Sequence, residues 1–429
     1  MKCNFVKSTF ILLIGGFVTK ILGMFIKIVM TRLLGTSGIG LYMLVSPTFM
    51  LLISIASLGL PVAVSKLVSE NSRNNKNVVF LCFPITLVVN IIIMFLMIFF
   101  SDFIASNLLN EPRIKYALVC IGFVLPFISI SSILRGYFFG RQMMVPHVVS
   151  NVVEDLIRLI VIAVGVPLFL IKGVNYAICF VVLSNVISEI SSIIVLFFFL
   201  PKNFKITKKD LYFDRQSVKD ILFISLPTTG SRLIGNIGYF FEPIIMTYFL
   251  LKSGYSNEFI INEYGIFNGY VMPLVLLPSF FTMAISQALI PVVSYNYSKG
   301  NYSYVKKKII QSILFSLLIG IPATLIFFFV PQIPLSFIYN TNEGISYIKF
   351  MSIVCLLHYI QSPISSSLQA MGRASDSMMG TLFGMIIRTL VLIVCCNIHI
   401  GMWGIVFAVS SNILFVTCYD FYKVKAYLK

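Results

Sequence analysis

The feature that most constrains this chain is a series of about twelve apolar runs, each long enough at roughly 20 residues to cross a bilayer as a helix. The runs take up most of the 429 residues, so that 58% of the chain is hydrophobic and only 11% is charged. We therefore predict an all-α polytopic membrane protein. Its spans lie near 9–30, 42–65, 78–100, 116–139, 147–171, 174–200, 221–250, 264–290, 308–330, 347–370, 375–397 and 400–422.

The loops between these runs are too short for a separate catalytic or nucleotide-binding domain. The longest polar stretch covers only 201–219, and the chain contains no GxxxxGK[ST] phosphate-binding loop. The eight cysteines lie mostly inside apolar runs without CxxC spacing, and the three histidines are scattered. We predict that the protein is not an enzyme and that it uses no metal and no cofactor.

The distribution of positive charge predicts the orientation in the membrane. Twenty of the 32 Lys and Arg fall in segments that share a side with the N-terminus, and only six fall in the opposite segments. Cytoplasmic loops retain positive charge, so we expect a bacterial cytoplasmic membrane protein with both termini inside. The net charge of +17 is mostly this topological signal, and we therefore expect no nucleic-acid partner.

Two halves of the chain resemble each other weakly. At an offset of 212 residues Lys20 aligns with Arg232, and further along Arg158 falls near Arg388. Six spans return the chain to its starting side, so the halves run parallel and are related by an axis along the membrane normal. We predict two parallel six-helix lobes around a central cavity, with 1–200 as the first lobe, 201–219 as a cytoplasmic linker and 220–429 as the second lobe.

Six cations lie inside or at the edge of the predicted spans. They are Lys20, Lys27, Arg135, Arg158, Arg232 and Arg388. A cation at the bilayer centre costs about 2.5–3.5 kcal/mol on insertion scales, which makes each of these residues a functional hypothesis.

The first and seventh spans carry cations that have no carboxylate one turn away on their own helix. Lys20 and Lys27 share a helix face, because seven residues make almost two turns, and Arg232 shares a face with Asn236. Lys27 has the alternative of snorkelling to the interface. Such cations attract anions, and phosphate or pyrophosphate is the anion most associated with membranes. We predict that Lys20, Lys27, Arg232 and Asn236 bind a phosphorylated substrate.

The acidic residues inside spans suggest coupling or gating. Glu154, Asp155 and Arg158 lie within one turn of one another and form either an internal ion pair or a functional group. Glu189 and Glu242 are candidates for coupling to Na⁺ or H⁺, and Arg388 for gating. The serine-rich faces of spans two and ten are more typical of helix packing than of substrate contact.

The opening stretch also carries a resemblance. The segments 20–23, 31–35, 38–42, 59–61 and 68–71, with 154–158 later, resemble the stage V sporulation protein B branch of the multidrug/oligosaccharidyl-lipid/polysaccharide (MOP) exporter superfamily. The resemblance implies a V-shaped pair of six-helix lobes working by alternating access. It also implies that Lys20, Lys27 and Arg232 contact a lipid diphosphate. One departure is that many peptidoglycan-precursor flippases carry two more C-terminal helices, which weakens lipid II specificity here but not transport of a lipid-linked glycan.

We therefore predict a flippase-type secondary transporter for a polyprenyl-diphosphate-linked saccharide, serving peptidoglycan or another envelope polysaccharide. Its partners are that substrate and membrane lipids. One alternative is a multidrug or organic-cation antiporter of the same fold, with Glu154, Asp155, Glu189 and Glu242 as ligands. A second is a scaffold that binds lipid-linked precursors without transporting them.

Overall fold

The computed structural model describes residues 2–70, 75–200 and 215–428, and these ranges are helical almost throughout. Their contacts divide the chain into unit 1, Met1–Phe240, and unit 2, Phe241–Lys429. The dividing point lies within a helix, and most of the predicted linker 201–219 lies outside the described residues. The predicted domain boundaries therefore stay a prediction.

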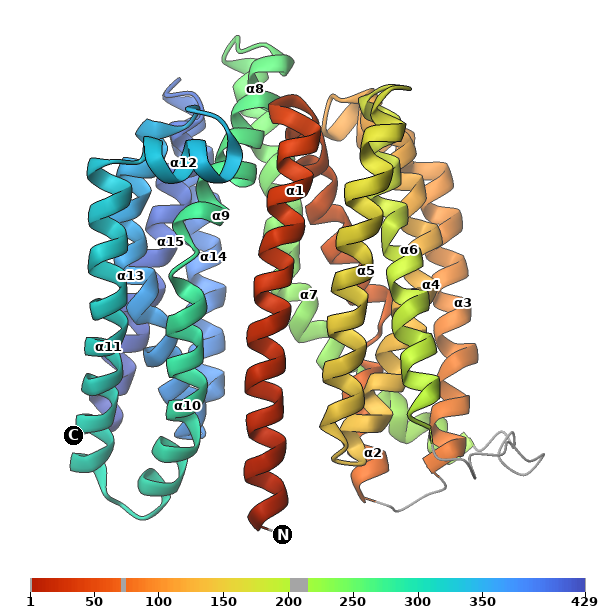
Figure 1. Ribbon diagram of the computed structural model, residues 1–429, viewed down its shortest axis with the longest axis vertical. Coiled ribbons are helices and arrows are strands. Elements are labelled where there is room, and N and C mark those ends of the chain that lie inside the picture. The colour runs from red at the N-terminus through yellow and green to blue at the C-terminus, as the bar shows by residue number, and fades with distance from the viewer. Residues whose placement is uncertain (1, 71–74, 201–214, 429) are drawn as a thin grey trace. The chain divides into compact units, whose positions relative to one another are not determined.

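Unit 1 is built from long helices that pack along their length. Within it α3, α4, α6 and α5 lie side by side, each in contact with the next (Figure 1). Its elements are α1 (Lys2–Ala56), α2 (Leu60–Glu70), α3 (Asn75–Asp102), the π-helical η1 (Phe103–Leu108), the 3₁₀-helical η2 (Pro112–Ile114), α4 (Lys115–Gly140), α5 (Met144–Leu170), α6 (Val174–Phe198) and the first part of α7 (Arg215–Lys252).

Unit 2 begins within α7 and contains a second group of packed helices. Here α13 contacts α10, α11 and α15, and α14 packs on α15. The elements are α8 (Asn257–Gly265), the π-helical η4 (Ile266–Val271), α9 (Met272–Val275), α10 (Ser279–Ser298), α11 (Tyr302–Phe329), α12 (Gln332–Tyr339), α13 (Ile345–Ala370), α14 (Ala374–Asn397) and α15 (Trp403–Tyr427).

The helices have the length and composition of membrane spans. Within the described residues eight helical stretches qualify, or nine with the bent pair Asn257–Val275 and Ser279–Ser298. One of the eight, Ile14–Glu70, covers most of the predicted span 9–30 and all of the span 42–65, and Gly35 between them leaves the helical conformation at φ 68°. The predicted spans at α5 and α13 are helical but lie outside the eight. The all-helical membrane fold is confirmed, whereas the number twelve stays a prediction.

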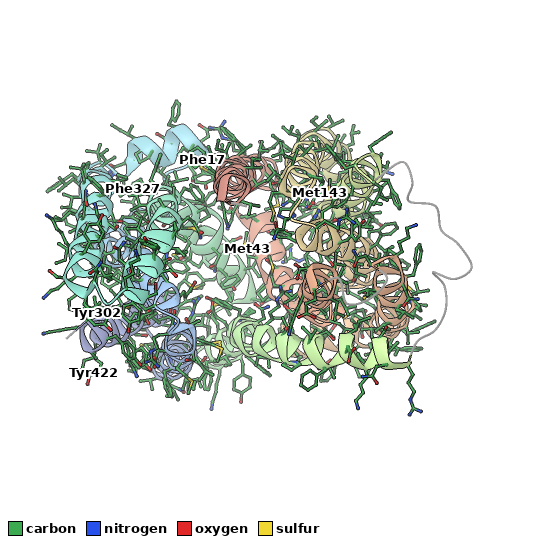
Figure 2. The ribbon with its side chains drawn as sticks, turned by 90° about the horizontal axis from the view of Figure 1, so that it is seen from below. Phe17, Met43, Met143, Tyr302, Phe327 and Tyr422 are labelled. Atoms are coloured by element: carbon green, nitrogen blue, oxygen red, sulfur yellow. The ribbon has the colours of Figure 1, made fainter. Side chains whose placement is uncertain are left out.

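The outer surface of each unit is apolar. Phe198 in unit 1 and Phe337 in unit 2 expose 85% and 81% of their surface. Apolar side chains with such exposure fit contact with lipid rather than water. In unit 2 the exposed Tyr302 and Tyr422 lie at the outside of the helices (Figure 2). Tyrosines at helix ends are typical of a membrane–water interface.

Each unit contains a span that breaks partway, and each break is held by a hydroxyl. In unit 1 the break after Ala56 passes through Leu58 and Gly59, both with positive φ. The freed carbonyl of Ala56 accepts a hydrogen bond of 3.2 Å from Ser129 of α4. In unit 2 the helices on either side of 276–278 are bent by 52°, and Tyr359 of α13 donates to the freed carbonyl of Val275 at 2.5 Å. Both breaks are thus stabilised inside protein, as backbone at membrane depth requires.

Candidate functional site

Five charged residues on α4, α5 and α6 form one partly buried network in unit 1. Glu154 accepts hydrogen bonds from both Arg135 and Arg158. Arg135 also lies 3.5 Å from Glu189, and Arg158 lies 3.6 Å from Asp155. The predicted group at 154–158 is therefore an ion-pair network, and it extends to two further helices.

Hydroxyl groups complete the hydrogen bonding of this network. Ser131 donates to Glu189 at 2.5 Å, Ser192 accepts from Arg135 at 2.7 Å, and Ser188 accepts from Arg158 at 3.3 Å. The side chain of Glu189 is only 5% exposed. Buried charges are tolerated when they are paired and hydrogen-bonded in this way. The group nevertheless holds three carboxylates against two guanidinium groups, which leaves an acidic excess.

A cavity of about 340 Å³ lies beside this network within unit 1. Its polar lining is formed by Lys27, Tyr42, Ser46, Arg158, Asn185 and Glu189, and apolar side chains such as the Met43 labelled in Figure 2 line the rest. Among the residues that the structure describes, Lys27 forms no ion pair with any of the acids. The cavity therefore offers an ammonium group that is available to an anion.

Lys20 and Arg232 lie outside the lining of that cavity. Both side chains are exposed in unit 1, and neither forms an ion pair within the described ranges. The amide of Asn236 is engaged in packing, because it donates to Ser54 at 2.6 Å and so joins α7 to α1.

Unit 2 contains a buried ion pair of its own. Arg388 of α14 lies 2.5 Å from Glu242 of α7, and their side chains are 14% and 7% exposed. Glu242, which the sequence suggested as a coupling residue, is thus paired with Arg388. The six intramembrane cations fall into two groups, since Arg135, Arg158 and Arg388 have acidic partners whereas Lys20, Lys27 and Arg232 have none among the described residues.

Sequence reasoning missed several polar residues of both units. Tyr42 and Asn185 line the cavity, but the apolar sequence around each of them does not indicate a cavity-lining position. Asp420 is fully buried in α15. It could have been found as the one acid inside the predicted span 400–422. Within the described ranges, no group of three or more His, Cys, Asp and Glu comes together as a metal site would require.

Two family models match most of the chain. Residues 5–297 match the family model described as "Polysaccharide biosynthesis protein", and residues 268–394 match the model described as "MatE".

Two curated relatives and one solved structure extend this comparison. Over 97% of its length the chain is 36% identical to "Stage V sporulation protein B" of Bacillus subtilis, of which it covers 82%. Over 90% of its length it is 24% identical to "Lipid II flippase MurJ" of the same organism, of which it covers 76%. The inward-facing structure of a multidrug resistance MATE family transporter of the MOP superfamily superposes with a TM-score of 0.76 at 17% identity, covering 95% of each chain.

Proposed function

The chain belongs to the polysaccharide biosynthesis protein family, and from this premise we propose that it is a flippase for a polyprenyl-diphosphate-linked saccharide. It is a multi-pass membrane protein with the fold of MOP superfamily transporters. In the proposal it moves the substrate from the cytoplasmic to the outer leaflet of a bacterial cytoplasmic membrane by alternating access. Both termini lie on the cytoplasmic side, and the saccharide is a peptidoglycan precursor or another envelope polysaccharide unit.

One observation carries the proposal, namely the division of the intramembrane cations. Three are neutralised by carboxylates, as structural cations in a membrane are expected to be. Lys20, Lys27 and Arg232 have no such partner among the described residues, and all three belong to unit 1. Cations that are expensive to insert and lack an internal partner favour an external anion, and a diphosphate presents several strong acceptors.

In the proposed mechanism these three side chains hold the diphosphate while the saccharide occupies polar space and the polyprenyl chain stays in lipid. The hydroxyl of Tyr42 and the amide of Asn185 give the cavity beside Lys27 further hydrogen-bonding groups for polar substrate atoms. An inside-negative potential favours outward movement of an anion by about 2.3 kcal/mol per charge per 100 mV. The buried network of α4, α5 and α6 serves as the candidate for coupling to Na⁺ or H⁺.

The antiporter alternative is favoured by a different observation, the match of residues 268–394 to the MatE model. An organic-cation site needs carboxylates that are open to the substrate. Glu154 and Glu242 are instead bonded to arginines, and Asp155 lies 3.6 Å from Arg158. Glu189 lines the cavity, but it accepts a hydrogen bond from Ser131 and lies 3.5 Å from Arg135. This occupation of the acids favours the flippase.

The test is transport of defined lipid-linked saccharides in reconstituted vesicles. A charge-assisted hydrogen bond is worth about 1.5–3 kcal/mol, so Lys27→Ala or Arg232→Ala should lower transport at limiting substrate by roughly 10- to 150-fold. Lys252→Ala, at the exposed end of α7, is the matched control and should leave transport unchanged. The proposal would be refuted if Lys27→Ala and Arg232→Ala both transported the saccharide as well as the wild type. It would also be refuted if these variants lost efflux of organic cations instead of saccharide transport.

A further inference from the structure

A second acidic site lies in unit 2, apart from the network described above. Asp420 of α15 has no exposed surface. One carboxyl oxygen, Oδ2, accepts a hydrogen bond from Ser365 of α13, and the other, Oδ1, is buried without any hydrogen-bond partner. No cation pairs with Asp420 among the described residues. It therefore differs from Glu154 and Glu242, whose charges are balanced by arginines.

The elements packed around Asp420 supply little compensation for a negative charge. From α13 it meets the neutral Ser365, and from α14 it meets Gly380, where an added Cβ would lie 2.9 Å from Oδ1. The charge that acts on it from α14 is Asp376, which is also negative. On α15 itself the nearest cation in sequence is Lys423, which lies 3.0 Å from Asp376 and not on Asp420.

We propose that Asp420 is a proton-binding site whose loading is coupled to the packing of α14 and α15, and this coupling role rests on the transport function proposed above. In the arrangement described here the carboxyl group carries the proton on Oδ1. An ionised carboxylate that is buried without a partner is strongly unfavourable, whereas the neutral acid is tolerated in apolar surroundings.

Release of the proton from Asp420 changes the ion pairing between α14 and α15. The O–H bond of Asp420 breaks, the proton passes to water at the C-terminal end of α15, and a carboxylate is left facing Gly380. Lys423 lies three residues further along the helix, so that its ammonium group can move from Asp376 to the new carboxylate. That exchange breaks the α14–α15 contact at Asp376 and favours a looser packing of the two helices. A proton thus shifts an equilibrium between two packings.

The protonation state can be tested without transport, by infrared spectroscopy of the purified protein as a function of pH. A protonated carboxyl band should be present at neutral pH and disappear as the pH rises. The isosteric Asp420→Asn should remove it, whereas Glu343→Gln, at an exposed acid of unit 2, should retain it. Ser365→Ala keeps the acid and should move the pH at which the band disappears. A spectrum that is identical in wild type and Asp420→Asn would overturn the site.

Transport distinguishes failure of this inference from failure of the proposed function. In vesicles with an imposed proton gradient, Asp420→Asn should lose the acceleration by the gradient and keep transport without one, while Glu343→Gln should keep the acceleration. Equal acceleration of wild type and Asp420→Asn overturns the coupling role. Absence of saccharide transport by the wild type under every condition overturns the proposed function and with it the coupling role, and the infrared result still decides whether Asp420 binds a proton.

Discussion

Replacing one partner of the Glu242–Arg388 pair should destabilise unit 2 strongly. The side chain of Arg388 is 14% exposed, and in Glu242→Gln it loses the carboxylate that lies 2.5 Å away. Breaking a buried pair by removing one partner costs about 3–5 kcal/mol, because an uncompensated charge is left behind. Replacing both residues by Met removes the charge together with its partner. We expect that double variant to recover most of the lost stability.

The chain contains a built-in reporter for this measurement. Trp403 is the only tryptophan, and it packs in unit 2 against Tyr347, Phe350 and Phe407. Unfolding by sodium dodecyl sulfate in mixed micelles, followed by tryptophan fluorescence, therefore gives the free energy of unfolding of this unit.

Two controls make the outcome decisive. The exposed Lys252 lies on the same helix as Glu242, and Lys252→Ala should change the free energy of unfolding by less than about 0.5 kcal/mol. The reasoning is refuted if Glu242→Gln costs less than about 1 kcal/mol. It is also refuted if the double Met variant is no more stable than Glu242→Gln, since the cost would then come from lost contacts rather than from an unpaired charge.

Three further substitutions test how the helices are held. Tyr359→Phe leaves the carbonyl of Val275 unsatisfied at the break in unit 2, and in the fluorescence titration it should cost about 1–3 kcal/mol, whereas no loss would show that the hydrogen bond is dispensable. Gly136→Ala places a Cβ 2.6 Å from the carbonyl of Pro61 and should lower the free energy of unfolding by about 1–3 kcal/mol, measured by circular dichroism. Gly16→Ala, at an open helical position, should be neutral or stabilising by up to about 1 kcal/mol, and equal effects of the two alanines would contradict the packing argument.

Hydropathy alone was sufficient to predict the fold class, because a bilayer permits few structures and a helix satisfies its own backbone hydrogen bonds. The breaks were harder to predict. In unit 1 the break coincides with the sequence 57–59, where glycine permits positive φ, but leucine at 58 also adopts it. That conformation is enforced by tertiary contacts, since Ser129 of α4 holds the preceding carbonyl. A linear pattern does not contain such a contact.

The same limit applies to the candidate site. The sequence identified Lys20, Lys27 and Arg232 as cations in apolar spans, and it also identified Arg135 and Arg388 in the same way. Only the structure separates the two sets, because the acids that neutralise the arginines come from other helices and are distant along the chain. Glu154 lies 19 positions from Arg135, and Glu242 is further still from Arg388.

This separation bears directly on function. A cation that is neutralised by the protein contributes to packing whether or not a substrate is present, and its removal is felt mainly as lost stability. A cation without an internal partner is unfavourable in the membrane as long as no substrate is bound. Binding of an anion offsets this unfavourable free energy. Substitution of Lys27 should therefore affect transport more than unfolding, while substitution of Arg388 should affect unfolding at least as much as transport. Measuring both quantities on both variants separates the two kinds of cation, which sequence position cannot do.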